Sequence, residues 1–308
     1  MPLMRSAFIA LSRNRPLRHF CENSSLGVRL SSRFIAGMEI ADALRVAESV
    51  NQQGIAVTLD SLGESVTTEV EAHRAADIYH QLLDMLAVRK LNANISVKLT
   101  QMGLELDPLL AETIAWKLAE HARATGNFVR IDMEDAKVTQ TTLDIVRRIH
   151  ARPEARDAVG VVIQAYLYRS QSDIEQLIAE GIRVRLCKGA YKEPAEVAFP
   201  HKADVDANYV RLGCLLIDSP LYHGLATHDE AMIEAIKAHA KKNGIEPSRY
   251  EFQMLYGVRR DLQRKLVQLG YKVRVYIPFG TDWYPYFMRR LAERPANVIF
   301  LARNFFRS

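Results

Sequence analysis

Residues 128–163, FVRIDMEDAKVTQTTLDIVRRIHARPEARDAVGVVI, decide the fold class of this chain. The stretch begins with a β-rich run, Phe128–Asp132, and ends with a second one, Val159–Ile163. Between them, Leu143 to His150 carries apolar residues at the three- and four-residue spacing of an amphipathic helix. A strand, a helix and a second strand in this order indicate a parallel pair of strands joined by a helical crossover.

The same pattern recurs along the chain. Six further β-rich runs are expected at Ile55–Leu59, Ile95–Leu99, Ile182–Leu186, Gly224–Thr227, Tyr250–Met254 and Val273–Ile277. Helical spacing is found over Asp107–Thr125, Asp173–Glu180, 229–243 and 260–269. Eight strands that alternate with helices over roughly 255 residues predict a closed, distorted TIM-like (β/α)8 barrel of the α/β class. An open doubly wound sheet is the alternative fold.

The composition excludes several classes of protein. Apolar residues make up 48% of the chain and charged residues 25%, which excludes collagen, a disordered chain and a multi-span membrane protein. No uninterrupted apolar run reaches the length of about 18 residues that a membrane-spanning helix needs. Cys21, Cys187 and Cys214 are too few and too widely spaced for a disulfide framework or a CxxC zinc site. These features favour a reducing, cytoplasmic compartment.

The positive charge is concentrated in the leading segment. The chain has a net charge of +5, and residues 1–38 contain six arginines but only one acidic residue, Glu22. The rest of the chain is therefore balanced, which disfavours nucleic-acid binding because that needs a basic surface on the folded domain. The segment suits a targeting peptide, a contact with an anionic membrane surface, or a helical extension packed on the body. We predict a basic helical extension over residues 1–45 and a catalytic barrel over residues 46–308.

Polar residues gather where the predicted strands end. Catalytic groups of (β/α)8 barrels lie at the carboxyl ends of the strands. In this chain those ends carry Lys98, Asp132, Gln164, Arg185, Lys188, Thr227, His228 and Tyr276. A set of polar strand ends that meet at one rim predicts the active site there.

Two adjacent arginines, Arg289 and Arg290, follow the last predicted strand in a segment that is expected to be helical. Glu293 lies one helical turn further on and could form an ion pair with one of them. Two planar guanidinium groups suit a small carboxylate, because each can bind it through two hydrogen bonds. The alternative interpretation is a solvated helix face with an incidental acidic partner.

The fifth predicted strand ends in Arg185-Leu186-Cys187-Lys188-Gly189-Ala190-Tyr191. A cation here could stabilise negative charge that develops on a bound cofactor. Gly189 would let the backbone approach a ligand closely, and Tyr191 could pack against a ring. A structural salt bridge inside the barrel is the alternative.

Acidic and histidine residues near the rim admit a metal interpretation, which the sequence supports only weakly. Asp132, Glu134 and Asp135 are clustered, but no histidine joins them at ligand spacing, and Asp135 suits the N-cap of the next helix. We therefore predict that Asp132 is an inward carboxylate paired with an arginine, and we expect no metal. His228 could be a ligand, an acid–base group or a hydrogen-bonded rim histidine. Dinucleotide-binding, P-loop and nucleophile-elbow motifs are missing from the sequence.

Seven strings occur in order along nearly the whole chain, namely SVKL (96–99), RIDME (130–134), QAY (164–166), RLCKGAY (185–191), ATHD (226–229), EFQMLYG (251–257) and WYPYFMRRLAER (283–294). Together they resemble monofunctional bacterial proline dehydrogenases, which are related to the proline dehydrogenase domain of proline utilization A. The resemblance implies a flavin-binding barrel that oxidises L-proline to Δ1-pyrroline-5-carboxylate and passes the electrons to a membrane quinone. A second, aldehyde dehydrogenase domain does not fit within 308 residues.

The resemblance also implies roles for individual residues. Asp132 and Arg185 would take part in catalysis, with Asp132 shaping the substrate side and Arg185 stabilising negative charge on the flavin. Proline would be bound by Lys98, Tyr191, Leu255, Tyr276, Arg289 and Arg290, with Glu293 orienting one arginine. FAD would be held by Met133, Gln164, Arg185, the turn Lys188, Gly189 and Ala190, and by Thr227 and His228.

A quinone acceptor requires access to a bilayer. The basic leading segment, together with the aromatic and basic residues from Phe300 to Arg307, could attach the protein to the inner face of the membrane from the cytoplasm. Core-facing aromatic residues in a final helix are the alternative. Two other function classes remain open: another flavin-dependent barrel such as a methylenetetrahydrofolate reductase, and a non-catalytic binding module.

Overall fold

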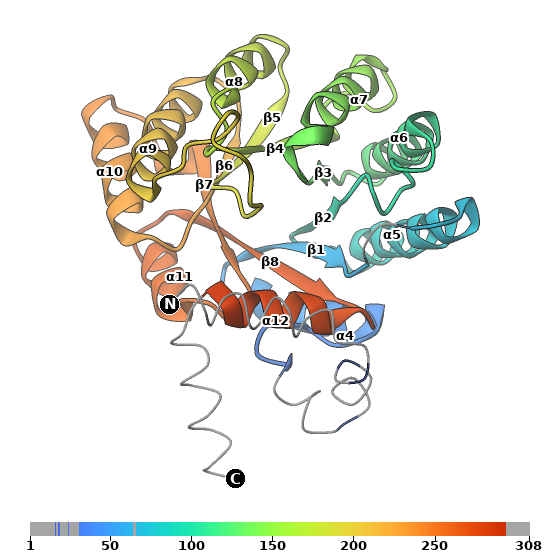
Figure 1. Cartoon of the computed structure of the whole chain (residues 1–308). Helices are drawn as coiled ribbons and strands as arrows, with labels where there is room; N and C mark the ends of the chain where they lie inside the picture. Colours follow the sequence, from blue (N-terminus) through green and yellow to red (C-terminus); the bar gives the residue numbers. More distant parts are fainter. Residues whose placement is uncertain (1–15, 17, 19–23, 25–30, 64–65, 294–308) are drawn as a thin grey trace.

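A computed structural model shows the fold of the chain (Figure 1). It describes residues 16, 18, 24, 31–63 and 66–293, with side chains described as far as Met288. Most of the predicted extension over residues 1–45, and the segment from Phe300 to Arg307, lie outside the described residues. The boundary predicted after residue 45 falls within the first helix of the figure, α4 (Ile40–Asn51), which packs against the barrel.

Eight parallel strands close into a barrel in the order of the sequence. They are β1 (Ala56–Ser61), β2 (Ala93–Val97), β3 (Val129–Ile131), β4 (Val159–Gln164), β5 (Arg183–Cys187), β6 (His223–Ala226), β7 (Tyr250–Leu255) and β8 (Lys272–Phe279). The barrel closes where β8 pairs with β1, with Tyr276 beside Thr58. The predicted TIM-like barrel is therefore confirmed, and the open doubly wound sheet is excluded.

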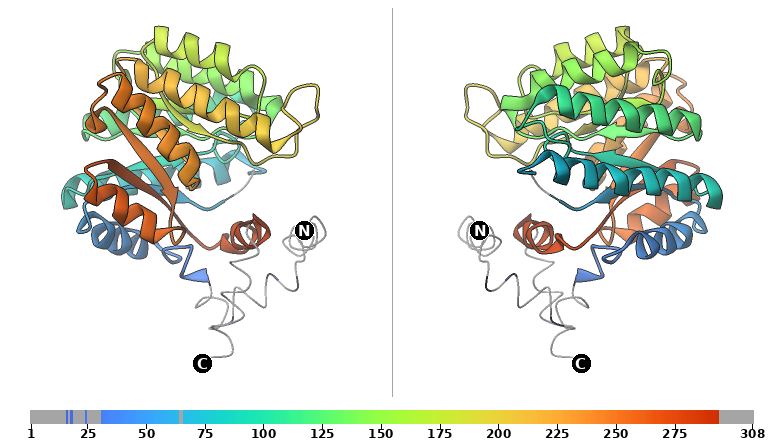
Figure 2. Two further views of the ribbon diagram at one scale, coloured as in Figure 1. Left: turned by 90° about the vertical axis from the view of Figure 1, so that its left-hand side faces the viewer. Right: turned by 90° about the vertical axis from the view of Figure 1, so that its right-hand side faces the viewer.

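Helices alternate with the strands and surround the barrel (Figures 1 and 2). One α-helix lies between each pair of successive strands: α5 (Glu69–Arg89), α6 (Pro108–Ala124), α7 (Thr139–Ala151), α8 (Ser170–Ala179), α9 (Lys202–Asp218), α10 (Glu230–Lys242) and α11 (Arg260–Gln268). The short helix η1 (Ala136–Val138) precedes α7, and η2 (Pro247–Arg249) follows α10. The last helix, α12 (Trp283–Glu293), follows β8. The outer position beside β8 and β1 is taken by α4, which contacts both strands. This departure from a regular barrel leaves α12 away from the ring of helices (Figure 2).

Local sequence signals set several helix ends. Thr68 begins α5 in a capping box, in which its side chain accepts from the Glu71 amide while Glu71 accepts from the backbone of Thr68. Asp107 caps α6 and precedes a proline at the first helical position. These caps fix where the two crossover helices begin.

The two faces of the strands have different partners. Branched residues such as Val57, Ile95 and Val184 belong to the large buried apolar cluster of the barrel. Alternate positions carry polar side chains that are nevertheless buried, among them Thr58, Ser96, Arg130, Arg185, Glu251 and Gln253. Because branched apolar residues usually fill the inside of such barrels, this polar interior calls for hydrogen-bond and charge partners.

No helix in the described part of the chain is both long and apolar enough to cross a membrane.

Candidate active site

Asp132 follows β3 directly and is the centre of a hydrogen-bonded cluster at the carboxyl end of the barrel. Its Oδ1 accepts from Arg185 Nη1 at 2.9 Å and from Ser96 Oγ at 2.6 Å. Its Oδ2 accepts from the Tyr276 hydroxyl at 2.8 Å. These partners come from β2, β5 and β8, so the closure of the barrel assembles the cluster. The ion pair predicted between Asp132 and an arginine is present.

Lys98 lies between two carboxylates. Its Nζ is 2.9 Å from Oδ1 of Asp60 and 3.8 Å from Oδ2 of Asp132. Burial alone would lower the pKa of Lys98, but the negative charges of Asp60 and Asp132 outweigh burial and hold its pKa above the ordinary value. Burial raises the pKa of Asp60, and Lys98 acts in the opposite direction. Lys98 is therefore a fixed positive charge at the mouth.

Arg185 is buried inside the barrel and held from two sides. Its Nε donates to Gln253 Oε1 at 2.6 Å, and its Nη1 binds Asp132. Its Nη2 is buried and has no hydrogen-bond partner among the described residues. The guanidinium carbon lies 5.3 Å from the centre of the Tyr276 ring, a cation–π contact. Burial and the charge of Asp132 raise the pKa of Tyr276 well above its ordinary value, so the phenol stays protonated and donates to Asp132.

A second group of predicted residues lies at the ends of β4 and β6. Gln164 Nε2 donates to the Met133 carbonyl at 3.3 Å, whereas its Oε1 is buried without a partner among the described residues. Thr227 Oγ1 accepts from the Asp229 amide at 3.1 Å. His228 Nε2 accepts from the Leu255 amide at 2.9 Å, which makes His228 a hydrogen-bonded rim histidine, one of the three alternatives open from sequence.

The loop after β5 has contacts that the sequence did not reveal. Lys188 Nζ lies 2.7 Å from Asp206 Oδ1 and 3.6 Å from Asp229 Oδ2, so two carboxylates hold this cation. Gly189 has a φ of +103°, and a Cβ there would lie 2.1 Å from the Tyr166 ring. The glycine is therefore required by packing as well as by backbone conformation. The next two residues, Ala190 and Tyr191, are exposed.

The acidic residues beside Asp132 are engaged separately. Glu134 accepts from the Thr100 amide at 3.1 Å and from its hydroxyl at 2.6 Å, and burial raises the pKa of Glu134. Asp135 caps η1 as predicted, accepting from the Lys137 amide. Within the described ranges, no group of three histidine, cysteine or acidic residues could hold a metal ion.

The two arginines predicted to bind a carboxylate, Arg289 and Arg290, belong to α12. The backbone of Arg289, Arg290 and Glu293 is helical, but their side chains lie outside the described part of the structure. Earlier in α12, Trp283 and Phe287 pack in one apolar cluster with Val258, against which Leu255 also lies. The helix thus runs next to the carboxyl end of β7, at the same end of the barrel as Asp132.

Sequence reasoning missed several members of the cluster. Asp60 near the end of β1 and Gln253 within β7 contact Lys98 and Arg185 respectively, and both side chains are buried. Asp60 is a polar residue near the carboxyl end of a strand. The other rim residues were predicted from that same feature, so Asp60 could have been predicted from it too. The Gln253 contact spans 68 residues and depends on barrel closure.

A groove of about 860 Å³ opens beside the cluster, between the carboxyl ends of β1 and β8 and the helices α4 and α5. Ser61 and Gln101 line it, and both hydrogen-bond to the Tyr79 hydroxyl. Tyr79 in turn contacts Asp60 at 3.4 Å, so the groove borders the charged cluster.

Comparison with known proteins identifies relatives of this chain. The family model described as proline dehydrogenase matches residues 43–303. The chain is 40% identical over 302 residues to proline dehydrogenase 1 of Bacillus subtilis strain 168, covering 98% of each chain. It is 40% identical over 277 residues to a proline dehydrogenase of Deinococcus radiodurans, covering 89% of each.

Bifunctional relatives match over part of their length. Bifunctional protein PutA of Escherichia coli K12 is 27% identical over 317 residues, which cover 89% of this chain and 24% of that protein. Among solved structures, proline utilization A of Bdellovibrio bacteriovorus inactivated by N-propargylglycine superposes with a TM-score of 0.83 and 26% identity. The match covers 94% of this chain and 36% of the other, about a third of its length. The extent of these matches, and the closed barrel they share, place the chain in the proline dehydrogenase family.

Proposed function

We propose that the protein oxidises L-proline to Δ1-pyrroline-5-carboxylate with bound FAD and passes the electrons to a membrane quinone. The observation that carries this proposal is the hydrogen-bonded, charged cluster at the carboxyl end of the barrel, in which the half-buried Asp132, Lys98 and Tyr276 meet the buried Arg185. Membership of the proline dehydrogenase family supports the same function.

The proposed substrate site uses fixed charges and apolar walls. Lys98 keeps its positive charge and, with Arg289 and Arg290, would bind the proline carboxylate, while Glu293 would orient one of these arginines. Tyr276, Leu255 and Tyr191 would enclose the pyrrolidine ring. Positioning of this kind can lower the activation barrier by ~7–11 kcal/mol.

The residues present fit a flavin. Arg185 Nη2 is a buried donor and Gln164 Oε1 a buried acceptor, and neither has a partner among the described residues. They lie on neighbouring strands whose register pairs Val162 with Arg185 and Gln164 with Cys187. A ring with hydrogen-bond acceptors and an N–H group would satisfy both atoms. Met133, Lys188, Gly189, Ala190, Thr227 and His228 would complete the FAD site.

When bound in this site, FAD would supply a two-electron acceptor for the hydride removed from C5 of proline. The amine must react in its neutral form, because its lone pair drives the departure of the hydride. In the described cluster, the cations Lys98 and Arg185 are balanced by Asp60 and Asp132. Arg289 and Arg290 would add positive charge, which lowers the pKa of a nearby ammonium group. The buried Arg185 guanidinium would favour added negative charge on the cofactor.

Transfer to quinone would take place at the inner face of the membrane. The basic residues of the segment 1–38 would supply a peripheral attachment worth ~1 kcal/mol each near an anionic surface. The protein itself would remain on the cytoplasmic side.

Anaerobic titration of the purified protein tests the proposed function. We expect a yellow protein whose flavin absorbance bleaches on addition of L-proline. A yellow protein that NADH bleaches and L-proline does not would favour a reductase of the methylenetetrahydrofolate reductase type. A colourless protein that does not take up added FAD would indicate a binding module and contradict the proposal.

A further inference from the structure

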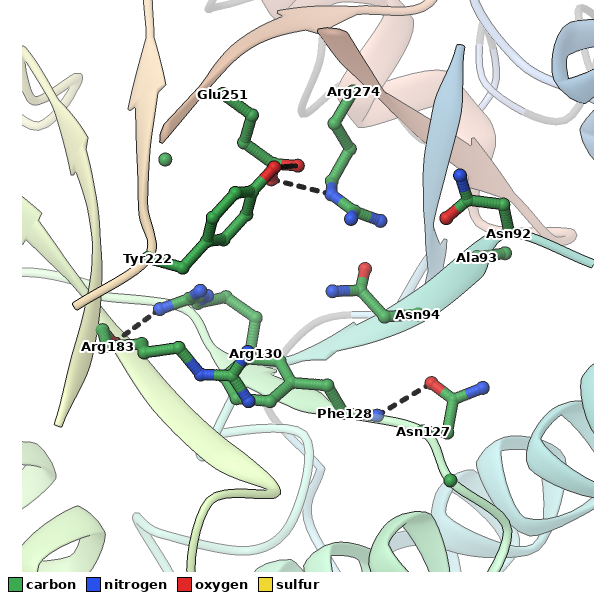
Figure 3. Close-up of a pocket in the computed structure, with 12 residues that line it drawn as sticks. Asn92, Ala93, Asn94, Asn127, Phe128, Arg130, Arg183, Tyr222, Glu251 and Arg274 are labelled. Carbon is green, nitrogen blue, oxygen red and sulfur yellow. Dashed lines mark hydrogen bonds and ion pairs between the residues drawn. The ribbon is translucent and has the colours of Figure 1, made fainter. Parts of the chain in front are cut away.

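A second cavity lies at the opposite end of the barrel from Asp132. It has a volume of about 230 Å³ and is lined by residues at the amino-terminal starts of the strands (Figure 3). Phe128 directly precedes β3, Arg183 begins β5, and Glu251 is the second residue of β7. The proposed proline and flavin sites lie at the carboxyl ends of the same strands, so this cavity belongs to neither.

The walls of this cavity carry an excess of positive charge. Three arginines line it, Arg130, Arg183 and Arg274, together with a single carboxylate, that of Glu251. Arg274 Nε is paired with Glu251 Oε1 at 2.7 Å, and Glu251 also accepts from the Tyr222 hydroxyl at 3.0 Å. Among the described residues, no carboxylate lies within ion-pair distance of Arg130 or Arg183.

Arg130 is the most unusual of these groups. It is 5% exposed, and its Nη1 donates only to backbone carbonyls, at 2.6 Å to Arg183 and 3.2 Å to Val161. Its Nε is buried without a partner in the described part of the chain. Burial and the charges of Arg185 and Arg183 lower the pKa of Arg130 well below its ordinary value. The charge of Glu251 offsets this effect only in part. A buried cation with no carboxylate in ion-pair contact is costly, because burial removes water without supplying a partner.

The surroundings hold the two guanidinium groups in place. The Phe128 ring centre lies 3.9 Å from the Arg183 guanidinium carbon and 4.8 Å from that of Arg130. Gly160 makes the space, because a Cβ there would lie 2.7 Å from Arg130 Nη1 and 2.4 Å from the Arg183 carbonyl oxygen. Asn94 extends toward the same cavity (Figure 3), and its Oδ1 accepts a hydrogen bond from the Thr58 hydroxyl. Its amide nitrogen can therefore serve as a further donor.

We propose that this cavity binds a small oxyanion, a phosphate or a carboxylate, between Arg130 and Arg183 with the Asn94 amide as a third donor. Guanidinium groups recognise such anions through paired, charge-assisted hydrogen bonds. The cavity has room for such an anion, since its volume corresponds to about eight waters at ~30 Å³ each. The bound anion supplies the negative charge that the walls lack.

Isothermal titration calorimetry of the full-length protein with inorganic phosphate, at constant ionic strength set by sodium chloride, tests this site. We expect saturable binding of one phosphate per chain. Arg183→Gln should weaken it at least ~10-fold, as the loss of a charge-assisted pair implies, whereas Arg183→Lys, which keeps the charge but not the planar fork, should weaken it less than Arg183→Gln does. Arg45→Gln, which removes the same charge from the 73% exposed Arg45 on α4, is the matched control and should bind as the unaltered protein does.

Acetate titrations identify which oxyanion the site prefers. The acetate and phosphate titrations are both made in the Arg290→Met background, because either anion could also enter the site proposed for the proline carboxylate. Saturable binding of phosphate or acetate that Arg183→Gln weakens supports the site, and the tighter of the two identifies its ligand. Arg130→Gln should have the same effect provided that its circular dichroism and melting temperature match the parent. Absence of saturation for both anions, or equal binding by the parent and Arg183→Gln, would overturn the proposal whatever the protein does with proline.

Discussion

Arg185 donates from Nε to the side-chain oxygen of Gln253 at 2.6 Å, across the inside of the barrel from β5 to β7. The amide nitrogen of Gln253 donates in turn to Glu251 Oε1 at 2.6 Å, so both ends of this amide are engaged. Gly224 provides the room, since a Cβ there would lie 2.2 Å from Gln253 Nε2. Gln253 therefore fixes the orientation in which Arg185 meets Asp132.

Gln253→Met should disturb Arg185 without touching the substrate. Removing one partner of a buried charged donor costs about 1–3 kcal/mol, and we expect kcat/KM for proline to fall roughly 10-fold. The flavin reduction potential should become more negative, because the positive charge is less well fixed. Gln263→Met, which removes an equally buried amide that donates to the Val258 carbonyl at 2.8 Å, is the control for lost stability alone. A potential that is the same in Gln253→Met and in the parent would show that Gln253 does not position Arg185.

Tyr276→Phe should reduce turnover of proline by removing one of the hydrogen bonds that hold Asp132. The variant removes the hydroxyl that donates to Asp132 Oδ2 at 2.8 Å and leaves the ring in place. The loss of a hydrogen bond to a charged group corresponds to about 1.5–3 kcal/mol, so kcat/KM for proline should fall ~10- to 100-fold. Steady-state kinetics measures this effect. Tyr250→Phe, which alters a buried tyrosine at the other end of the barrel, should leave kcat/KM unchanged.

Arg290→Met tests whether Arg290 binds the carboxylate of proline. The variant keeps much of the length of the side chain but removes the fork that would bind the proline carboxylate. The KM for proline should rise by well over ~10-fold, while the flavin content measured by absorbance stays that of the parent. A KM equal to that of the parent would remove Arg290 from the proposed site.

Acid stability should depend on one buried histidine. His223 accepts from the Val184 amide at 2.9 Å, and burial together with the charge of Arg130 lowers its pKa to about 3. The unfolded chain binds a proton below the ordinary pKa of about 6.5, whereas the folded chain does not until pH is far lower. Stability from this residue is therefore complete above pH ~6.5 and is lost progressively toward pH ~3.

Between pH 7 and pH 5 this linkage should remove about 2 kcal/mol from the free energy of unfolding. Urea denaturation across that range measures it. His223→Asn retains an acceptor for the Val184 amide but does not titrate, so its stability should fall less on acidification. His73→Asn, at an exposed position on α5, should keep the parental pH dependence. Identical pH dependence in His223→Asn and the parent would contradict the assignment.

Membrane attachment should depend on the leading arginines. Replacing Arg5, Arg13 and Arg15 by glutamine should cost ~3 kcal/mol of binding to anionic vesicles, about a 100-fold loss in partitioning. Co-sedimentation measures this loss. Replacing Lys117, Lys241 and Lys242 in the barrel helices by glutamine removes the same amount of charge and should have little effect on binding to these vesicles. Equal losses in the two triple variants would assign the attraction to net charge and contradict a role for the segment.

The sequence predicts the strands well because each carries its own local signal. The runs at Val159–Ile163 and Tyr250–Met254 agree with β4 and β7 to within one residue. Three helices, α4, α5 and α9, were not identified, although the capping box at Thr68 and Glu71 was a usable sign of α5.

The candidate site was predictable only in part. Asp132, Arg185 and Tyr276 could be placed at the rim because strand ends converge in a barrel. Their particular partners could not, because contacts such as Lys98 with Asp60 and Arg185 with Gln253 are set by the register of the closed sheet. The sequence also did not reveal that Lys188 is held by Asp206 on α9 and by Asp229 at the start of α10, because these contacts depend on how the helices pack beside the end of β5.

The central claim is that cationic side chains hold the carboxylate of proline so that its C5 faces the flavin. The most direct measurement compares the anaerobic rate of flavin reduction by L-proline with that by pyrrolidine, the same ring without the carboxylate. Proline should reduce the flavin at least ~100-fold faster than pyrrolidine does, and Arg290→Met should remove most of this difference. Equal rates for the two amines in the unaltered protein would contradict this claim.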